Sequence, residues 1–299
     1  MPSRETFAYR RNLKLRAQKA VETEDSSIDN VFSRAQDDFL TFCTLLDKPP
    51  ARHMLEWHRE LITGESNKYL LDIAGPNLDI LSPRGSAKST VLNLFTAWVI
   101  GRHTQAGRPL QIIYCSYNIA TAIPKSRIIK QIIDASTFKK IFPRVKLKAG
   151  MQSDIGWSVD FDYAGIDRIG DEEFTLRAAG LRGSITSKRA HLVIVDDPIK
   201  SSSDIKNPAV REEMNNNWSS VIAPIVFEGG RSICLGTRFH PLDIHKTMFV
   251  PQKGWKQVAQ EALTYDKEGE PISYWPEQWS VEYLQGQKEL DPVAFAYQY

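Results

Sequence analysis

A short polar loop, Ser82 to Thr90, contains the residue types that bind phosphate groups. It follows an apolar run, Leu78–Leu81, and leads into Lys88–Arg102, where apolar residues recur at helical spacing. In such a loop, backbone amides at the start of a helix attract polyphosphate oxygens, a lysine reaches the outer phosphates, and a hydroxyl binds Mg²⁺. The sequence therefore predicts a nucleotide-binding loop made of Pro83, Arg84, Gly85, Ser86, Ala87, Lys88, Ser89 and Thr90, with Lys88 catalytic and Ser89 a metal ligand.

This loop differs from the common phosphate-binding pattern G-x-x-x-x-G-K-[ST] at both glycines, which Ser82 and Ala87 replace. Taken alone, the segment is also compatible with a Gly/Ser turn that precedes a helix and contains an incidental lysine. Two further motifs at strand ends favour the phosphate loop.

Two adjacent acids, Asp196 and Asp197, follow the apolar run His191–Val195. Acids at the carboxyl end of a strand are placed to handle a metal ion and an attacking water, so we expect Asp196 to bind Mg²⁺ and Asp197 to orient the water as a catalytic residue. ATPases with this arrangement usually have glutamate at the second position. Aspartate is one methylene shorter, and a misplacement of about 1 Å can cost about 10²-fold in rate. Either the backbone lies closer here, or another acid such as Glu212 or Glu213 takes the role.

A third apolar run, Ile233–Leu235, ends in Gly236, Thr237 and Arg238. In sheets of this kind, the third strand lies between the strands that carry the first two motifs. Its end would therefore sense the γ-phosphate and pass that state onward, with Thr237 and Arg238 as the sensors. A strand that simply ends in a turn is the alternative for this motif alone, but the three motifs support one another in this order.

The elements that must position these residues alternate between strand and helix. Repeated β–α units predict a parallel sheet covered by helices. The expected strands are Leu78–Leu81, Leu110–Tyr117, His191–Val195 and Arg231–Gly236, with more hairpin-like candidates at Asp160–Tyr163 and Phe174–Ala178. The expected helices are Val31–Leu46, Ala51–Ile62, Lys88–Arg102, Asn118–Ala135 and Pro208–Val221. The predicted fold class is α/β, a P-loop NTPase of the additional-strand type with a mainly parallel central sheet flanked by helices and a small C-terminal lid or linker region.

Length and composition agree with this class. The 299 residues are 42% hydrophobic and 25% charged, the balance of an ordinary globular protein. No span approaches the roughly 18–20 apolar residues of a transmembrane helix, and the charged N-terminus has no apolar core, so we expect neither a membrane span nor a secretory signal. Three cysteines without metal-like spacing fit a reducing cytoplasm.

The net charge of +2 conceals two basic stretches. Residues 1–20 contain six basic side chains and one acid, and residues 124–148 contain eight basic side chains and one acid. Such clusters can neutralise the phosphates of a nucleic acid. Solvated helix faces are the alternative, so the charge alone supports but does not establish contact with double-stranded DNA.

The motifs resemble those of the large terminase subunit of tailed bacteriophages, the ATPase that drives DNA into empty capsids. The resemblance covers about residues 45–299, and its more specific parts are the stretch GTRFHPLD and the ending WPEQWS…FAYQY. It rests on Pro83–Thr90, Leu192–Pro198, Gly236–Asp243, Trp275–Ser280 and Phe295–Tyr299.

This resemblance implies Mg²⁺-dependent ATP hydrolysis coupled to translocation of double-stranded DNA into a procapsid. The implied partners are the portal protein, the small terminase subunit and further copies of the chain in a ring, in the host cytoplasm and without a membrane. We divide the chain into a basic, helical extension (1–45), an ATPase core (46–254) and a lid or linker (255–299). Terminases of this kind also have a C-terminal nuclease domain, which the FAYQY-like segment precedes, so we expect this chain to contain no nuclease domain and to cut no DNA.

Two further assignments come from the resemblance. Arg182 is similar to the arginine that completes the site of a neighbouring subunit, with Arg84 in the phosphate loop as a rival and a solvated loop arginine as the simpler alternative. His58 resembles the position near adenine, although a plain helix-surface histidine is the more common case.

Two other functions remain open at this point. A nucleotide-binding assembly module with weak hydrolysis would explain the missing glycines and the aspartate in place of glutamate. A helicase-like ATPase would normally need a second domain of the same fold, for which 299 residues leave little room.

Overall fold

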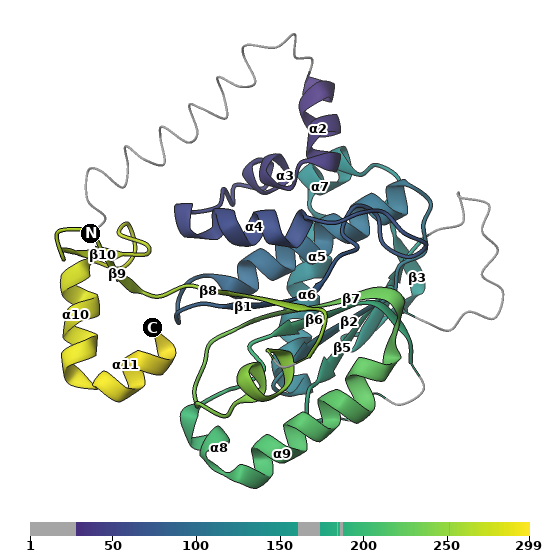
Figure 1. Cartoon of the computed structure of the whole chain (residues 1–299). Helices are drawn as coiled ribbons and strands as arrows, with labels where there is room; N and C mark the ends of the chain where they lie inside the picture. Colours follow the sequence, from purple (N-terminus) through teal and green to yellow (C-terminus); the bar gives the residue numbers. More distant parts are fainter. Residues whose placement is uncertain (1–27, 161–173, 184, 186–187, 251) are drawn as a thin grey trace.

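The structure is a computed structural model that describes residues 28–160, 174–183, 185, 188–250 and 252–299. The basic stretch at residues 1–20 and most of the strand expected at Asp160–Tyr163 lie outside these residues. Among the described residues, eight strands form one sheet in the order β3-β4-β5-β2-β6-β7-β1-β8, with helices on both of its faces (Figure 1).

The strands of the sheet are β1 (Asn77–Leu81), β2 (Ile112–Ser116), β3 (Leu147–Gln152), β4 (Gly156–Val159), β5 (Leu176–Gly180), β6 (Ala190–Asp196), β7 (Val226–Gly236) and β8 (Trp255–Ala259). The six strands from β5 to β8 in the sheet order run parallel, and β4 and β3 add an antiparallel edge. The predicted α/β class with a mainly parallel sheet is confirmed. So is the position of the sensor strand, because β7 lies between β6 and β1.

The helices on one face are α2 (Ile28–Asp37), α3 (Phe39–Leu45), η1 (Arg52–Met54), α4 (Leu55–Ile62), α5 (Lys88–Gln105), α6 (Ile119–Asp134) and α7 (Ser136–Ile141). The elements on the other face are α8 (Ser202–Lys206), α9 (Pro208–Asn217), η3 (Trp218–Ile222), η4 (Ala223–Ile225) and η5 (His245–Phe249). Buried side chains form one core on each side of the sheet, and alternation along the strands decides which side each residue faces. In β7, for example, Ile233 and Leu235 belong to the first core and Cys234 to the second.

Several element boundaries differ from the sequence-based prediction. The helix expected over Val31–Leu46 is two helices, because Asp38 adopts an extended backbone and its carboxylate caps α3 by accepting from Leu40 N. The helix expected at Pro208–Val221 is α-helical only to Asn217 and continues as the π-helical turn η3. The edge strand β3 was not predicted, since Leu147–Gln152 is half-polar and half-exposed.

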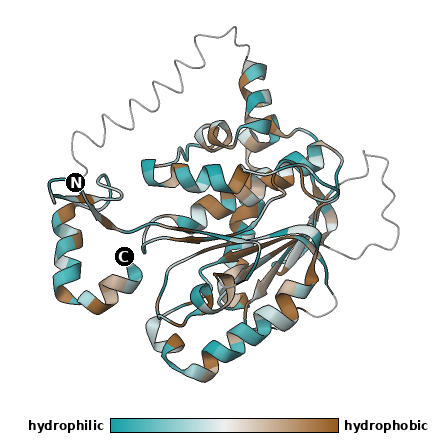
Figure 2. Cartoon of the chain, viewed as in Figure 1, coloured by the Kyte–Doolittle hydropathy of each residue, from teal (hydrophilic) through white to brown (hydrophobic). Residues whose placement is uncertain are grey.

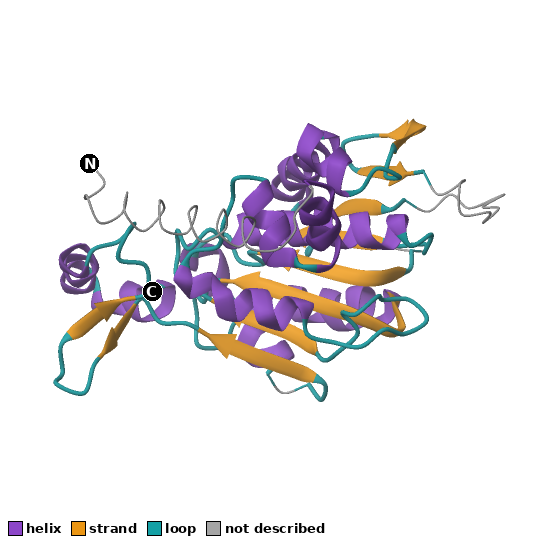
Figure 3. Cartoon of the chain, turned by 90° about the horizontal axis from the view of Figure 1, so that it is seen from above, coloured by secondary structure: helices purple, strands orange, loops and turns teal. Residues whose placement is uncertain are grey.

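The C-terminal region divides at a point beyond residue 254. β8 pairs with β1 in parallel register and so belongs to the central sheet, although it falls within the region 255–299 that we assigned to the lid. The remaining elements, β9 (Leu263–Tyr265), β10 (Pro271–Ser273), α10 (Val281–Leu290) and α11 (Pro292–Gln298), form a small unit around Leu284 and Phe295. Figure 3 shows this C-terminal unit beside the main body.

Hydropathy follows this architecture. The strands of the sheet are mostly hydrophobic, whereas the outer surfaces of α9 and α10 are mostly hydrophilic (Figure 2). Within the part of the chain that the structure describes, no helix is long and apolar enough to cross a membrane.

Candidate active site

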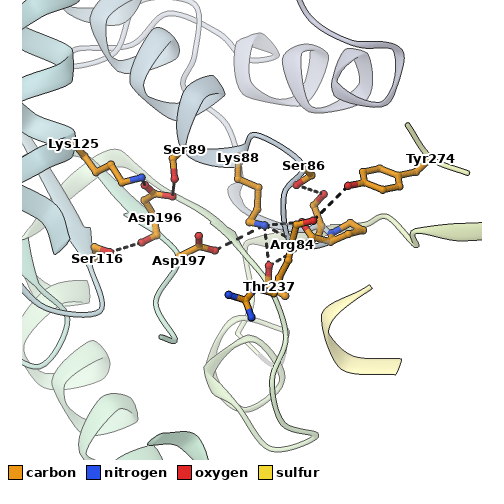
Figure 4. Close-up of polar contacts among 12 residues, drawn as sticks. Arg84, Ser86, Lys88, Ser89, Ser116, Lys125, Asp196, Asp197, Thr237 and Tyr274 are labelled. Atoms are coloured by element: carbon orange, nitrogen blue, oxygen red, sulfur yellow. Dashed lines mark hydrogen bonds and ion pairs between the residues drawn. The ribbon is translucent and has the colours of Figure 1, made fainter. Parts of the chain in front are cut away.

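The register of the parallel strands brings the three motifs together. Leu81 at the end of β1 pairs with Gly236 at the end of β7, and Asp196 at the end of β6 pairs with Leu235. The carboxyl ends of parallel strands share one edge of a sheet, where ligands of such folds bind. Figure 4 shows that Lys88, Ser89, Asp196, Asp197 and Thr237 converge there.

The phosphate loop has the backbone of a nucleotide-binding loop in spite of its missing glycines. Gly85 and Ala87 both adopt left-handed conformations, with φ of 73° and 62°. Such a conformation costs a non-glycine residue about 1–3 kcal/mol, so Ala87 keeps a shape that glycine would adopt without strain. Ser82 has no positive φ, and its hydroxyl instead donates to the Ser86 hydroxyl across the loop at 2.9 Å.

Lys88 is the centre of the polar network. Its ammonium group is buried and donates to the carbonyls of Ser82 (3.3 Å) and Pro83 (2.8 Å) and to Thr237 Oγ1 (2.8 Å). Burial lowers the pKa of Lys88, and the nearby carboxylates of Asp197 and Asp196 oppose this shift. The amine therefore lies where the sequence predicts a phosphate-binding lysine, at the start of α5 and between two strand ends.

Asp196 is almost fully buried and strongly hydrogen-bonded. Its Oδ1 accepts from Ser89 Oγ at 2.9 Å, and its Oδ2 accepts from the Tyr114 hydroxyl at 3.1 Å and lies 3.4 Å from Lys125 Nζ. Burial and the charge of Asp197 raise the pKa of Asp196, while Lys125 and the two hydroxyl donors oppose the rise. The predicted pair of metal ligands, Ser89 and Asp196, is thus assembled by direct contact.

The donor set fits the predicted metal. A hydroxyl and a carboxylate are hard oxygen ligands, and Mg²⁺ typically takes one or two such protein groups together with phosphate oxygens and water. The two oxygens lie 2.9 Å apart at the first turn of α5, next to the phosphate loop. These residues could therefore hold Mg²⁺ beside a bound nucleotide.

Asp197 differs from Asp196 in its backbone conformation and in its exposure to solvent. Its backbone φ is 47°, a rare conformation for a non-glycine residue, and its side chain is 46% exposed. Its Oδ1 lies 4.0 Å from Lys88 Nζ, so this carboxylate faces the position where phosphates would bind. Of the alternative acids, Glu213 is paired with Arg182 at 2.7 Å and Glu212 is exposed on α9.

The two residues of the sensor motif, Thr237 and Arg238, make different contacts. Thr237 is buried, donates to the Ser82 carbonyl at 3.0 Å and accepts from Lys88, so it connects β7 directly to the phosphate loop. Arg238 instead donates to the Pro241 carbonyl of its own turn at 3.3 Å. The contacts therefore give Thr237 the more direct link to the phosphate loop.

Of the two candidate arginines, Arg84 lies close enough to Lys88 for its charge to lower the pKa of that amine. Arg182 follows β5 and is held by Glu213 and by the Tyr117 hydroxyl at 3.1 Å. Arg84 is exposed on the phosphate loop, where its Nη1 donates to Gln298 Oε1 at 3.2 Å. Both guanidinium groups are thus bound within this chain.

His58, which the resemblance places near adenine, is a buried residue in the structure. It is buried in the first core, its ring stacks on Phe39 at 4.5 Å, and burial lowers its pKa to about 4. The histidine that contacts the phosphate loop is His53, whose Nε2 lies 3.2 Å from the Ser86 carbonyl and whose ring packs on Trp275 at 4.6 Å. The sequence does not predict this contact, because His53 lies on η1 and His58 on α4, and the two side chains meet different neighbours.

Two other groups at the site were not assigned to it from sequence. The sequence places Lys125 in a basic stretch and Tyr114 in a strand, and it links neither residue to Asp196. The structure supplies the missing step: β2 is the neighbour of β6, so a polar residue on β2, and a lysine in the helix that follows it, lie near Asp196. Ser116 at the end of β2 does donate to the Asp196 carbonyl at 2.7 Å.

Comparison with known proteins found similarity in sequence and in fold. No protein-family model matches the chain. The terminase large subunit of Enterobacteria phage T3 is 24% identical over an alignment of 283 residues that covers 89% of this chain and 44% of that protein. The chain thus spans less than half the length of this relative.

Solved structures supply the comparison of the fold. An arginine-to-alanine variant of the large terminase ATPase domain of Thermus phage P74-26 matches with a TM-score of 0.51 and 12% identity, over 86% of this chain and 96% of that chain. The unmutated domain gives a TM-score of 0.49 and 14% identity over 86% and 95%. In its sequence and in its fold, this chain resembles the ATPase region of the large terminase subunit of tailed bacteriophages.

Proposed function

We propose that this chain is the ATP-hydrolysing motor region of a viral terminase large subunit. The observation that carries the proposal is the meeting of Lys88, the Ser89–Asp196 pair and Asp197 at one edge of the sheet. These are a phosphate-binding cation, a hard-oxygen metal site and an exposed carboxylate, which phosphoryl transfer to water requires together.

Each group would have a separate task. Lys88 would exchange its carbonyl partners for the β- and γ-phosphate oxygens, and amides of the phosphate loop would bind the remaining oxygens. Mg²⁺ bound by Ser89 and Asp196 would neutralise part of the phosphate charge. Asp197 would accept a hydrogen bond from the attacking water and so orient it.

Thr237 would report on the phosphates. Its hydroxyl accepts from the Lys88 ammonium group and donates to the Ser82 carbonyl, so a change in the position of Lys88 would alter these hydrogen bonds. From β7 and β1 the change would reach β8 and the C-terminal unit, and movement of that unit would drive duplex DNA. Arg127 on α6 and Lys139 and Lys140 on α7 belong to the basic stretch that would contact the DNA backbone without reading its sequence.

The partners follow from the same proposal. The portal protein, the small terminase subunit and other copies of the chain in a ring would surround it in the host cytoplasm. In such a ring, Arg182 or Arg84 would leave its present partner and complete the site of a neighbour. Transition-state arginines of this kind contribute about 10³–10⁵ in rate.

Steady-state ATP hydrolysis, with and without duplex DNA, tests the proposal. We expect Lys88→Ala to reduce turnover by about 10²–10³-fold, because a phosphate clamp is lost. Lys267→Ala, in an exposed turn far along the chain, should match the unmodified protein. Turnover that survives Lys88→Ala would contradict the assignment of the phosphate loop, and stimulation by DNA would support the motor.

An assembly module with weak hydrolysis is the second candidate, and the short side chain of Asp197 favours it. That function predicts nucleotide binding without turnover at every protein concentration. A motor that lacks only its neighbour's arginine should instead gain turnover per chain as concentration rises.

A further inference from the structure

One carboxylate oxygen of Asp196, Oδ2, is contacted by both a hydroxyl group and an ammonium group. Oδ1 faces Ser89, whereas Oδ2 faces the Tyr114 hydroxyl and Lys125 Nζ, at 3.1 and 3.4 Å. Figure 4 shows Lys125 reaching Asp196 from the side opposite to Lys88.

Lys125 is the cation nearest to this carboxylate among the described residues. Lys88, the other ammonium group of the site, donates to two carbonyls and to Thr237, and its ion-pair contact is with Asp197. Asp196 itself is 1% exposed, and a buried carboxylate needs a compensating charge. Lys125 supplies that charge from α6, an element that carries none of the three predicted motifs.

The side chain of Lys125 also has a route away from the site. It is 28% exposed, while Asp196 is 1% exposed, so the ammonium group can move toward solvent and the carboxylate cannot follow. Two cations that share one carboxylate repel each other. The repulsion is strong here because the surroundings of low polarity screen the charges weakly. Lys125 Nζ lies 3.4 Å from Oδ2 of Asp196. A divalent cation bound to Asp196 would therefore be repelled by the charge of Lys125.

We propose that Lys125 is a positioning residue that competes with the divalent cation for Asp196 and so sets how strongly nucleotide binding depends on Mg²⁺. The inference rests on the proposed function and adds a residue to its metal site. In the absence of Mg²⁺, Lys125 holds Asp196 in place and attracts phosphate groups. When Mg²⁺ binds with the nucleotide, Lys125 retreats, and its retreat reduces the affinity gained from the metal.

This mechanism predicts how the affinity for nucleotide changes both without and with Mg²⁺ when the charge of Lys125 is removed. Lys125→Gln keeps the length and polarity of the side chain but removes its charge. The variant should bind nucleotide more weakly in EDTA, because one attractive charge is lost. It should gain more affinity from Mg²⁺ than the unmodified protein, because the competing charge is also lost.

The experiment measures the dissociation constant of a slowly hydrolysed ATP analogue by titration calorimetry, once in EDTA and once in excess Mg²⁺, on the full chain. The readout is the dissociation constant in EDTA divided by the dissociation constant in Mg²⁺. This ratio does not depend on turnover. We expect Lys125→Gln to raise this ratio by about tenfold, within the usual range of coupling between two sites. Lys125→Arg, which keeps the charge, should retain a ratio close to that of the unmodified protein.

Lys130→Gln is the matched control. Lys130 lies on the same helix and in the same basic stretch, but it contacts the Ser153 carbonyl and not the site, so its ratio should not change. An unchanged or lower ratio for Lys125→Gln would overturn the inference while nucleotide binding itself remains. Failure of the unmodified protein to bind the analogue would overturn the proposed function, and the inference with it.

Discussion

Asp196 and Asp197 are neighbours in the chain but differ in their exposure to water. Asp196 continues the alternation of β6 and is 1% exposed, whereas the positive φ of Asp197 turns its side chain outward to 46% exposure. A buried, hydrogen-bonded carboxylate suits a metal site, and an exposed one suits contact with water. The strained backbone of Asp197 is of the kind that clusters at active sites.

His58 illustrates a buried group with a measurable effect on stability. Its pKa of about 4 lies below the ordinary value near 6.5, because burial disfavours the charged ring. As the pH falls below 6.5, the unfolded chain takes up a proton before the folded one does, so stability present above pH 6.5 is lost on the way to pH 4. His53 has the same low pKa, from burial.

We predict that His58→Phe flattens this loss of stability. The phenyl ring replaces an imidazole whose Nδ1 is buried without a hydrogen-bond partner, and it keeps the stacking on Phe39. Between pH 7 and pH 5, the unfolding free energy of the variant should fall by about 2 kcal/mol less than that of the unmodified protein, measured by urea denaturation. Equal pH dependence in both proteins would contradict the prediction. A tenfold loss of nucleotide affinity in the variant would support the role of His58 near adenine.

At the scale of elements, a buried polar network joins β1, β8 and η5. Asp79 on β1 binds His245 Nδ1 at 2.8 Å and accepts from Gln257 Nε2 on β8 at 2.8 Å. Burial alone would lower the pKa of His245, but the Asp79 carboxylate more than offsets this and the pKa is raised. The ring of His245 covers Gly236, where a Cβ atom would lie 2.7 Å from the ring and 3.1 Å from Pro198 Cδ.

We therefore predict that Gly236→Ala destabilises the protein by about 1–3 kcal/mol, the usual effect of overpacking a core. The added methyl group must displace a ring that is held by an ion pair, and the phosphate loop should lose affinity for nucleotide at the same time. Gly286→Ala is the control, because that glycine lies within α10 with no atom near its added Cβ. It should stabilise the protein by about 0.5–1 kcal/mol, since alanine favours a helix.

Chemical denaturation of both variants decides between these effects. The prediction is wrong if the two glycine substitutions change the unfolding free energy in the same direction.

At the scale of the whole molecule, the C-terminal unit rests on the phosphate loop. The Arg84 amide donates to the Gln298 carbonyl at 3.0 Å, and the indole of Trp279 covers Gly85, where a Cβ atom would lie 2.6 Å from its ring. Two residues that are nearly 200 positions apart thus share one surface. This contact gives the loop a physical connection to the unit that would move during translocation.

We predict that Trp279→Ala loosens the C-terminal unit without unfolding the core. Loss of the indole removes a large apolar contact and the hydrogen bond to the Gly85 carbonyl. Limited proteolysis should cut the variant several times faster within residues 260–299, while fragments of the central sheet stay resistant. Val293→Ala, which truncates an exposed side chain of the same unit, should be cut at the rate of the unmodified protein.

The sequence alone determined the local chemistry and the three strands that carry it. Apolar runs that end in polar residues marked β1, β6 and β7, and their order placed Lys88, Ser89, Asp196, Asp197 and Thr237 at one edge of the sheet. This inference succeeds because strand propensity, alternation and the direction of parallel strands are local or topological properties.

Only the tertiary structure decided which distant side chains complete the site. Lys125, Tyr114, His53 and Trp279 reach it from elements whose own patterns carry no chemical signature, and His58 turned out to be a core residue. Their positions depend on how helices pack on the sheet and on the rotation of each helix about its axis. Periodicity in the sequence specifies which face of a helix is buried, but the packing of the whole core fixes which neighbour that face meets.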